Sequence, residues 1–125
     1  MPKPRIADDV GRESVLRALA NQEDREIVAI AVRYLLQVLS EGAPGNSVEV
    51  RVPPFGAVQC IEGPGHTRGT PPNVVETDAL TWLEIATGGL EWAKALAEGR
   101  IAASGSRADL GAHLPLRWQR GSGGE

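Results

Sequence analysis

Apolar residues recur with a helical period near the start of the chain. Val10, Val15, Leu16 and Leu19 can share one face of a helix, and the charged residues Arg12, Glu13 and Arg17 lie between them in the sequence. This spacing places them on one face of an amphipathic helix over 8–20.

A second and longer helix is predicted over 22–40. Asn21 suits its N-cap, because an asparagine side chain can accept a hydrogen bond from the first free backbone N–H groups. Gly42, followed by Pro44, is predicted to end it. The helix is apolar around most of its circumference, and its polar stripe holds only Glu26, Arg33, Gln37 and Glu41. Such a helix must be covered on several sides, or line an apolar cavity or an oligomer contact.

The pattern then changes to the two-residue alternation of β-strands. Val48, Val50 and Val52 fall on one face of a strand predicted over 47–52. Three further strands are predicted at 57–62, 73–77 and 100–105.

Short helices are predicted around the last of these strands. Thr77 or Asp78 would cap a helix over 79–87 that ends at Gly88, and further helices are predicted at 91–98 and 107–114. The chain is thus expected to form a single domain over 1–125. It would consist of a helical part at 8–40, a sheet with short helices at 47–116, and a disordered tail at 119–125.

Composition narrows the class of protein. The 125 residues are 42% hydrophobic and 23% charged, which is typical of a soluble globular domain. The formal net charge of -3 argues against binding nucleic acid or an anionic membrane through bulk electrostatics. Cys60 is the only cysteine, so the chain has no internal disulfide and no thiolate-rich metal site. No run reaches the ~18 apolar residues of a membrane span, and a cytoplasmic protein is expected.

Reactive side chains are densest in the loop that follows the second strand. His66 could act as an acid or base, and Arg68 could bind a carboxylate or phosphate. An ordered turn, whose His66 and Arg68 side chains bind nearby backbone, is favoured over an anion site, because turn chemistry alone explains the glycines and prolines of this loop. His66 and His113 lack the spacing of a metal site, and no catalytic nucleophile motif is present. No metal is therefore expected.

The sequence from Thr77 reads T-D-A-L-T-W-L-E-I-A-T-G, then L-E-W-A-K-A-L-A-E-G-R-I-A-A-S-G. This stretch contains a short helix that ends in glycine and a second helix that also ends in glycine. A strand and a closing helix follow. This order resembles the carboxy-terminal half of the sterol carrier protein domain. The whole chain resembles the small stand-alone bacterial branch of that family, especially over 69–78.

The resemblance implies an α+β fold with about five strands. These would form a twisted, mostly antiparallel sheet with helices packed on one face. The fifth strand would come from 65–70 or from 116–118. The resemblance also implies an apolar tunnel that receives fatty acyl chains, sterols or similar ligands and needs no cofactor.

We therefore expect a non-enzymatic protein that binds or carries an apolar or amphipathic small molecule. His66 and Arg68 are candidates for contact with a polar headgroup. Eight apolar side chains from the predicted helices are expected to line the cavity: Val28, Val32, Leu35, Leu36, Leu39, Leu80, Leu83 and Trp92. One alternative is a homodimeric or partner-binding module that buries the apolar helix without a ligand. Another is a small enzyme using His66 and Arg68 on an anionic substrate.

Overall fold

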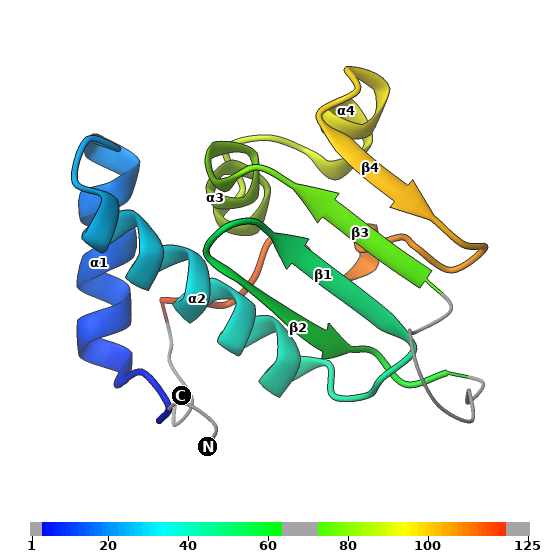
Figure 1. The fold of residues 1–125 in the computed structure, drawn as a ribbon, viewed down its shortest axis with the longest axis horizontal. Helices are drawn as coiled ribbons and strands as arrows, with labels where there is room; N and C mark the ends of the chain where they lie inside the picture. The colour runs from blue at the N-terminus through cyan, green and yellow to red at the C-terminus, as the bar shows by residue number, and fades with distance from the viewer. Residues whose placement is uncertain (1–3, 64–72, 120–125) are drawn as a thin grey trace.

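The computed structural model describes residues 4–63 and 73–119 and has an α+β architecture (Figure 1). Two helices come first, followed by strands and shorter helices. In chain order the elements are α1 (Asp8–Ala20), α2 (Arg25–Gly42), β1 (Val48–Val52), β2 (Gly56–Cys60), β3 (Asn73–Thr77), α3 (Ala79–Thr87), α4 (Trp92–Ala97), β4 (Ile101–Ser104) and the 3-10 turn η1 (Gly111–His113).

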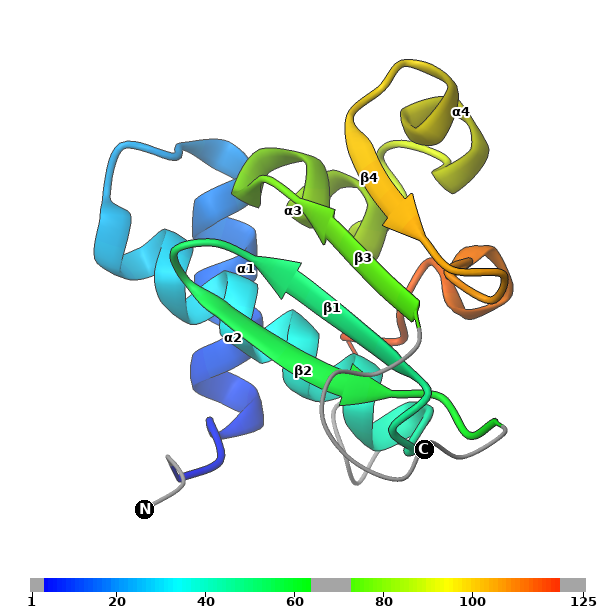
Figure 2. The same ribbon diagram turned by 45° about the vertical axis from the view of Figure 1, so that its right-hand side comes forward.

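The strands form one mixed sheet in the order β2-β1-β3-β4. β1 pairs antiparallel with β2 and parallel with β3, and β3 pairs antiparallel with β4. Val50 of β1 lies opposite Val58 on one side and Val75 on the other. Because side chains alternate along a strand, Val50 and Val75 are buried, whereas Glu76 is exposed. Figure 2 shows α1, α2 and α3 on the same side of this sheet.

The described part of the chain has four strands, where about five were expected. Residues 116–118 do not form the fifth. The backbone N–H of Leu116 instead donates to the carbonyl of Ala86 in α3 at 2.8 Å, which binds this segment to a helix. Pro115 also has no N–H to offer a strand ladder. The other candidate, 65–70, lies outside the described residues.

The start of α2 differs from the prediction by three residues. Asp24, not Asn21, is the N-cap, and its side chain accepts from the N–H groups of Glu26 and Ile27. Asn21 instead caps the end of α1, where its N–H donates to the carbonyl of Arg17 at 3.0 Å. Both residue types suit helix ends, and the structure uses one for each helix.

α1 explains why α2 is so apolar. One side of α2 faces the sheet and α3, and α1 packs against another side (Figure 1). The α1 residues buried in this contact are small or short: Gly11, Ser14, Val15 and Ala18. Gly11 lies directly against the ring of Tyr34, in a space that a Cβ would overlap. α1 therefore covers much of the apolar surface of α2 within one chain, whereas Ile27, Ile30 and Val38 stay half-buried.

The polar stripe of α2 is also occupied. Arg33 Nε donates to the carbonyl of Phe55 at 3.0 Å. Gln37 exchanges two hydrogen bonds of 2.9 Å with the backbone N–H and carbonyl of Ile6. Glu41 accepts two hydrogen bonds from the guanidinium of Arg5. Each of these side chains fixes another segment of the chain against α2.

The predicted helix over 107–114 is wrong except for one short turn. Only Gly111–His113 is helical, and it is a 3-10 turn. Asp109 accepts a hydrogen bond from the N–H of Gly111 at 2.7 Å, a side-chain alternative to continuing a helix. The irregular segment around this turn still covers the core, because Ala108, Leu110 and Trp118 are buried.

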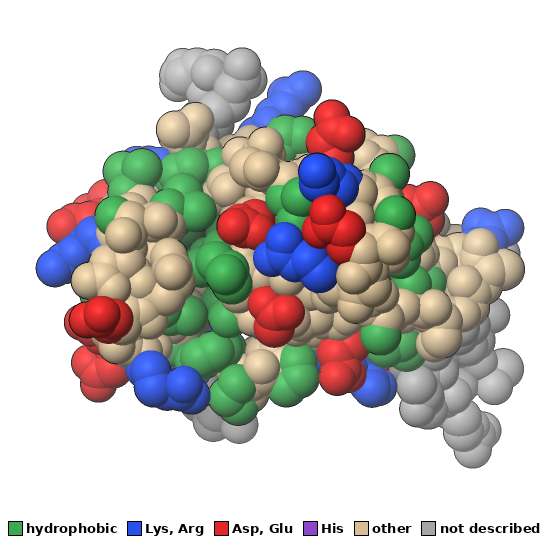
Figure 3. Space-filling model, turned by 90° about the horizontal axis from the view of Figure 1, so that it is seen from above, with side chains coloured by type: hydrophobic (Ala, Val, Ile, Leu, Met, Phe, Trp, Pro, Cys, Tyr) green, Lys and Arg blue, Asp and Glu red, His purple; other side chains and the backbone are tan. Residues whose placement is uncertain are grey.

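Charged side chains of both signs lie on the face seen in Figure 3, with hydrophobic side chains scattered between them. The exposed large hydrophobic residues include Leu16 and Leu19 of α1 and Leu80 of α3. Within residues 4–63 and 73–119, no helix has both the length and the apolarity needed to cross a membrane.

Candidate functional site

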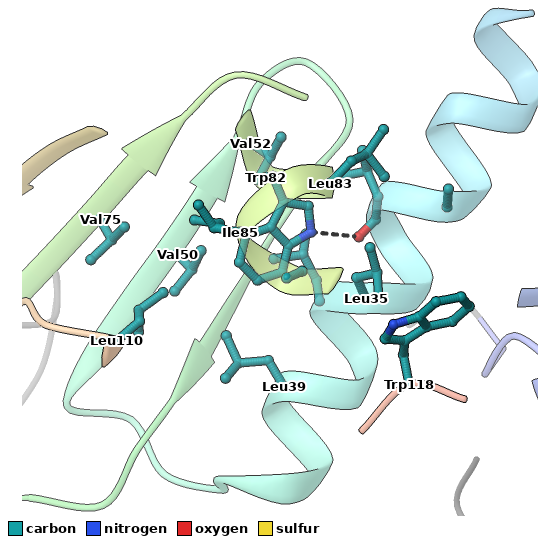
Figure 4. Close-up of a cluster of buried hydrophobic side chains, with 14 of the residues drawn as sticks. Leu35, Leu39, Val50, Val52, Val75, Trp82, Leu83, Ile85, Leu110 and Trp118 are labelled. Carbon is teal, nitrogen blue, oxygen red and sulfur yellow. Dashed lines mark hydrogen bonds between the residues drawn. The ribbon is translucent and has the colours of Figure 1, made fainter. Parts of the chain in front are cut away.

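Seven of the eight predicted lining residues belong to the buried core of the domain, and six of them lie on α2 and α3. Figure 4 shows Leu35, Leu39 and Leu83 close to the indole of Trp82. Trp82 is fully buried, and its Nε1 donates to the backbone carbonyl of Val32 at 3.3 Å. This indole takes up space between α2 and the sheet. The six core residues on α2 and α3 are Val28, Val32, Leu35, Leu36, Leu39 and Leu83.

The other two predicted residues are Leu80, which is not in the core, and Trp92, which is. Leu80 is 44% exposed, on the outside of α3. Trp92, at the start of α4, is nearly buried and forms part of the wall of a pocket. Leu39 lines a neighbouring pocket. For all eight predicted lining residues, contact with a ligand stays a prediction. His66 and Arg68 lie outside the described residues.

The first pocket has a volume of about 460 Å³ and lies between α3, α4 and the C-terminal segment. Most of its wall is apolar, and Glu91 is the charged residue among the described ones that line it. The wall consists of Ile85, Gly88, Leu90, Glu91, Trp92, Ala93, Gly111, Leu114 and Pro115.

The second pocket, of about 350 Å³, lies at the C-terminal end of α2. It is lined by Val38, Leu39, Gly42, Ala43, Ala112, His113, Leu114, Pro115, Leu116 and Arg117. Leu114 and Pro115 belong to the walls of both pockets. We call the two pockets together the C-terminal groove. Its cationic side chain, Arg117, and its histidine, His113, are both in the second pocket.

Short contacts hold the shared wall in place. Gly88 ends α3 with a left-handed φ of 95°, and a Cβ there would lie 3.4 Å from the ring of Pro115. Leu116 is tied to Ala86 by the backbone hydrogen bond described above. Gly111 lies against Trp92, where a Cβ would be 3.4 Å from the indole. These contacts place Leu114 and Pro115 between the two pockets.

The titratable groups of the core do not resemble a catalytic centre. Burial raises the pKa of Cys60 to about 11, so the thiolate that a nucleophile needs is disfavoured. Burial and a hydrogen bond to Asp8 raise the pKa of Tyr34 to about 12. Among the described residues, no three His, Cys, Asp or Glu side chains are grouped so that they could hold a metal ion. The C-terminal groove is lined mainly by apolar side chains, with Glu91, His113 and Arg117 among its wall residues.

The sequence did not predict most of this groove. Of the residues that line the two pockets, the sequence predicts a ligand contact only for Leu39 and Trp92. Leu114 and Pro115 were treated as the end of a helix. The signal that could have found them is the run Leu114-Pro115-Leu116, in which apolar side chains flank a proline that cannot continue a helix.

Comparisons with known proteins gave one finding. A family model described as "Bacterial SCP ortholog" matches residues 24–116. The match includes α2, the whole described sheet and all residues of the C-terminal groove except Arg117, and it begins after α1. A comparison with curated proteins found no match.

Proposed function

The chain belongs to the bacterial SCP ortholog family of sterol-carrier-protein-like domains, and on that premise we propose that it binds an apolar or amphipathic small molecule in the C-terminal groove. The observation that supports this site is the pair of apolar pockets joined at Leu114 and Pro115. We further propose that the protein carries its ligand without transforming it.

The size and chemistry of the groove suit this role. Both pockets fall within the ~300–1,000 Å³ range of small-molecule sites. Removing a ligand's apolar surface from water contributes about 25 cal/mol per Å². An alkyl or polycyclic body against Ile85, Leu90 and Leu114 would gain this energy without needing a matching pattern of hydrogen bonds.

Trp92 provides a direct reporter for ligand binding. Bromine quenches an indole that it contacts, so a fatty acid brominated along its chain should quench the fluorescence of Trp92 with a saturable dependence on concentration. The variant Trp92→Phe should lose most of this quenching. Trp118→Phe should retain it, because Trp118 lines neither pocket of the groove.

Two outcomes would count against the proposal. One is the absence of saturable quenching at micromolar protein. The other is quenching that survives in Trp92→Phe and disappears in Trp118→Phe, which would place the ligand elsewhere.

The alternative of a homodimeric or partner-binding module has less support. Its motivation was the surplus apolar surface of α2, and α1 covers much of that surface within the same chain. Light scattering at micromolar concentration tests the homodimer directly.

A further inference from the structure

A third pocket lies away from the C-terminal groove, beside the edge of the sheet that β2 forms. Its volume is about 600 Å³, the largest of the three. It lies between the N-terminal segment, the polar stripe of α2 and β2, and we call it the N-terminal pocket. Its wall consists of Pro4, Arg5, Ile6, Ile30, Arg33, Gln37, Ser40, Ala57 and Val58. It shares no residue with the two pockets of the groove.

The wall of the N-terminal pocket is apolar on three sides. Ile6 comes from the N-terminal segment, Ile30 from α2, and Val58 from β2. All three are half-buried, so each still presents part of its side chain to the pocket. A molecule with an apolar body could contact three separate segments of the chain here.

Most polar groups of this wall are already bound within the protein. Arg5 makes a two-pronged contact with Glu41, at 2.6 and 2.8 Å, and a further hydrogen bond to Asp8 at 3.0 Å. The amide of Gln37 is bound through both its oxygen and its nitrogen to the backbone of Ile6. The positive charge of Arg5 and the amide of Gln37 are therefore not available to a ligand.

Arg33 differs from these residues. Its Nε donates to the carbonyl of Phe55 at 3.0 Å, which fixes the guanidinium at the rim of the pocket. Among the ion pairs of residues 4–63 and 73–119, none involves Arg33. Its two terminal NH₂ groups thus carry an uncompensated positive charge beside an apolar surface. Among the described residues of the wall, none is acidic.

We propose that the N-terminal pocket is a second ligand site, which binds a small monocarboxylic acid with an apolar body. The carboxylate would bind the two terminal NH₂ groups of Arg33, whose planar arrangement fits two carboxylate oxygens. The body would lie against Ile6, Ile30 and Val58. A single available guanidinium neutralises one negative charge, which favours a carboxylate over a dianionic phosphate ester.

The position of this pocket separates it from the family's shared features. Its outer wall, Pro4 to Ile6, lies before the region 24–116 that the family model matches. Hydrogen bonds that Ile6 and Arg5 donate to Gln37 and Glu41 hold this wall in place. The site therefore depends on the N-terminal segment of this chain, and it does not depend on the proposed function of the C-terminal groove.

The test compares an acid with its neutral counterpart. Methyl-detected NMR of the full chain, titrated with 4-phenylbutyrate and separately with 4-phenyl-1-butanol, follows Ile6, Ile30 and Val58 together with Leu90 and Leu114 of the groove. The acid should shift the first three in a saturable manner and bind there about tenfold more tightly than the alcohol, because one partner is charged.

Variants identify the charge that is responsible. Arg33→Gln should weaken binding of the acid at Ile30 by about tenfold and leave binding of the alcohol unchanged. Arg33→Lys keeps the charge and should recover part of the loss. Arg17→Gln is the matched control, because Arg17 is exposed on α1 and lines none of the three pockets.

Several results would overturn this second site. Equal affinity for acid and alcohol at Ile30 would remove the role of Arg33. Tighter binding of hexyl phosphate than of 4-phenylbutyrate would refute the carboxylate. Shifts confined to Leu90 and Leu114 would leave the groove as the only site, whereas shifts confined to Ile30 would uphold the second site and count against the groove. If Arg33→Gln does not fold, the comparison of acid and alcohol on the unchanged protein still tests whether a positive charge contributes to binding at Ile30.

Discussion

α2 meets the rest of the chain in two very different ways at its two sides. Against α1 the contact is close, and Gly11, Ser14 and Ala18 allow the helices to approach until Tyr34 is fully buried. At its C-terminal end, α2 meets an irregular segment around Pro115, and pockets remain on both sides of that residue. Small residues at regular helical spacing produce dense packing, whereas a chain without regular structure leaves space that a ligand can use.

A substitution in the dense contact between α1 and α2 should cost more stability than one in the open contact around Pro115, and Gly11→Ala tests this. A Cβ at this position would overlap the ring of Tyr34, so either the ring or α1 must move. We expect a loss of about 3 kcal/mol in the free energy of unfolding, although alanine normally favours a helix over glycine by about 1 kcal/mol. Urea denaturation followed by circular dichroism measures this loss.

Gly42→Ala is the matched control for that substitution. Gly42 also lies in a helix, at the end of α2, and a Cβ there would meet nothing within 4 Å. Its stability should be unchanged or slightly increased. If Gly11→Ala behaved in the same way, the close approach of α1 to α2 would be refuted.

The same contact predicts a loss of stability at high pH. Burial and the hydrogen bond to Asp8 raise the pKa of Tyr34 from 10.0 to about 12, and burial raises the pKa of Cys60 from 9.0 to about 11. Both groups hold their protons more tightly in the folded state. Their contribution to stability is therefore complete below the unfolded pKa of each group and is lost as pH rises through the folded pKa. Tyr34 alone should remove about 2 kcal/mol between pH 10 and 12.

The chain contains one tyrosine, so its ionisation can be followed directly by the near-ultraviolet absorbance of tyrosinate. Stability measured in parallel on Cys60→Ala separates the two groups. A tyrosine that titrates near 10 in the folded protein would contradict the burial of Tyr34 under α1.

A substitution in the open contact around Pro115 should change the free energy of unfolding little and the affinity for a ligand clearly. Leu114 is half-buried and lines both pockets of the groove, so Leu114→Ala should cost about 1 kcal/mol of stability. Affinity for a long-chain fatty acid should fall several-fold, because the ligand loses an apolar wall. Isothermal titration calorimetry measures the affinity, with Leu16→Ala on the exposed face of α1 as control. A stability loss of the size expected for Gly11→Ala, with unchanged affinity, would reverse the contrast between the two regions.

Local sequence patterns predicted much of the fold. The helix at Asp8–Ala20 and the strand at Asn73–Thr77 have the predicted bounds, and Asp78 caps α3 as expected. The cap of α3 depends on a side chain three residues from the N–H that it accepts from. The bounds of α1 are as predicted, but its predicted apolar face is wrong: Val10, Leu16 and Leu19 are exposed, and the buried face holds Gly11, Ser14, Val15 and Ala18.

Features that depend on distant residues were not predictable in this way. The cover that α1 provides for α2 depends on Gly11 meeting Tyr34, and nothing in either helix alone indicates that pairing. The groove depends on Pro115 lying against Gly88, which are far apart in the sequence. The positive charge of Arg33 is available because Glu41, on the same polar stripe of α2, binds Arg5 instead. That contact joins residues 36 positions apart in the sequence.

Photochemical labelling tests the central claim, ligand binding in the C-terminal groove, most directly. A fatty acid carrying a diazirine along its alkyl chain is bound, irradiated and located by peptide mass spectrometry. We expect adducts concentrated in 38–43, 85–93 and 111–117, which an excess of unlabelled fatty acid should suppress. Adducts spread along the chain, or concentrated on α1 and insensitive to competitor, would contradict it.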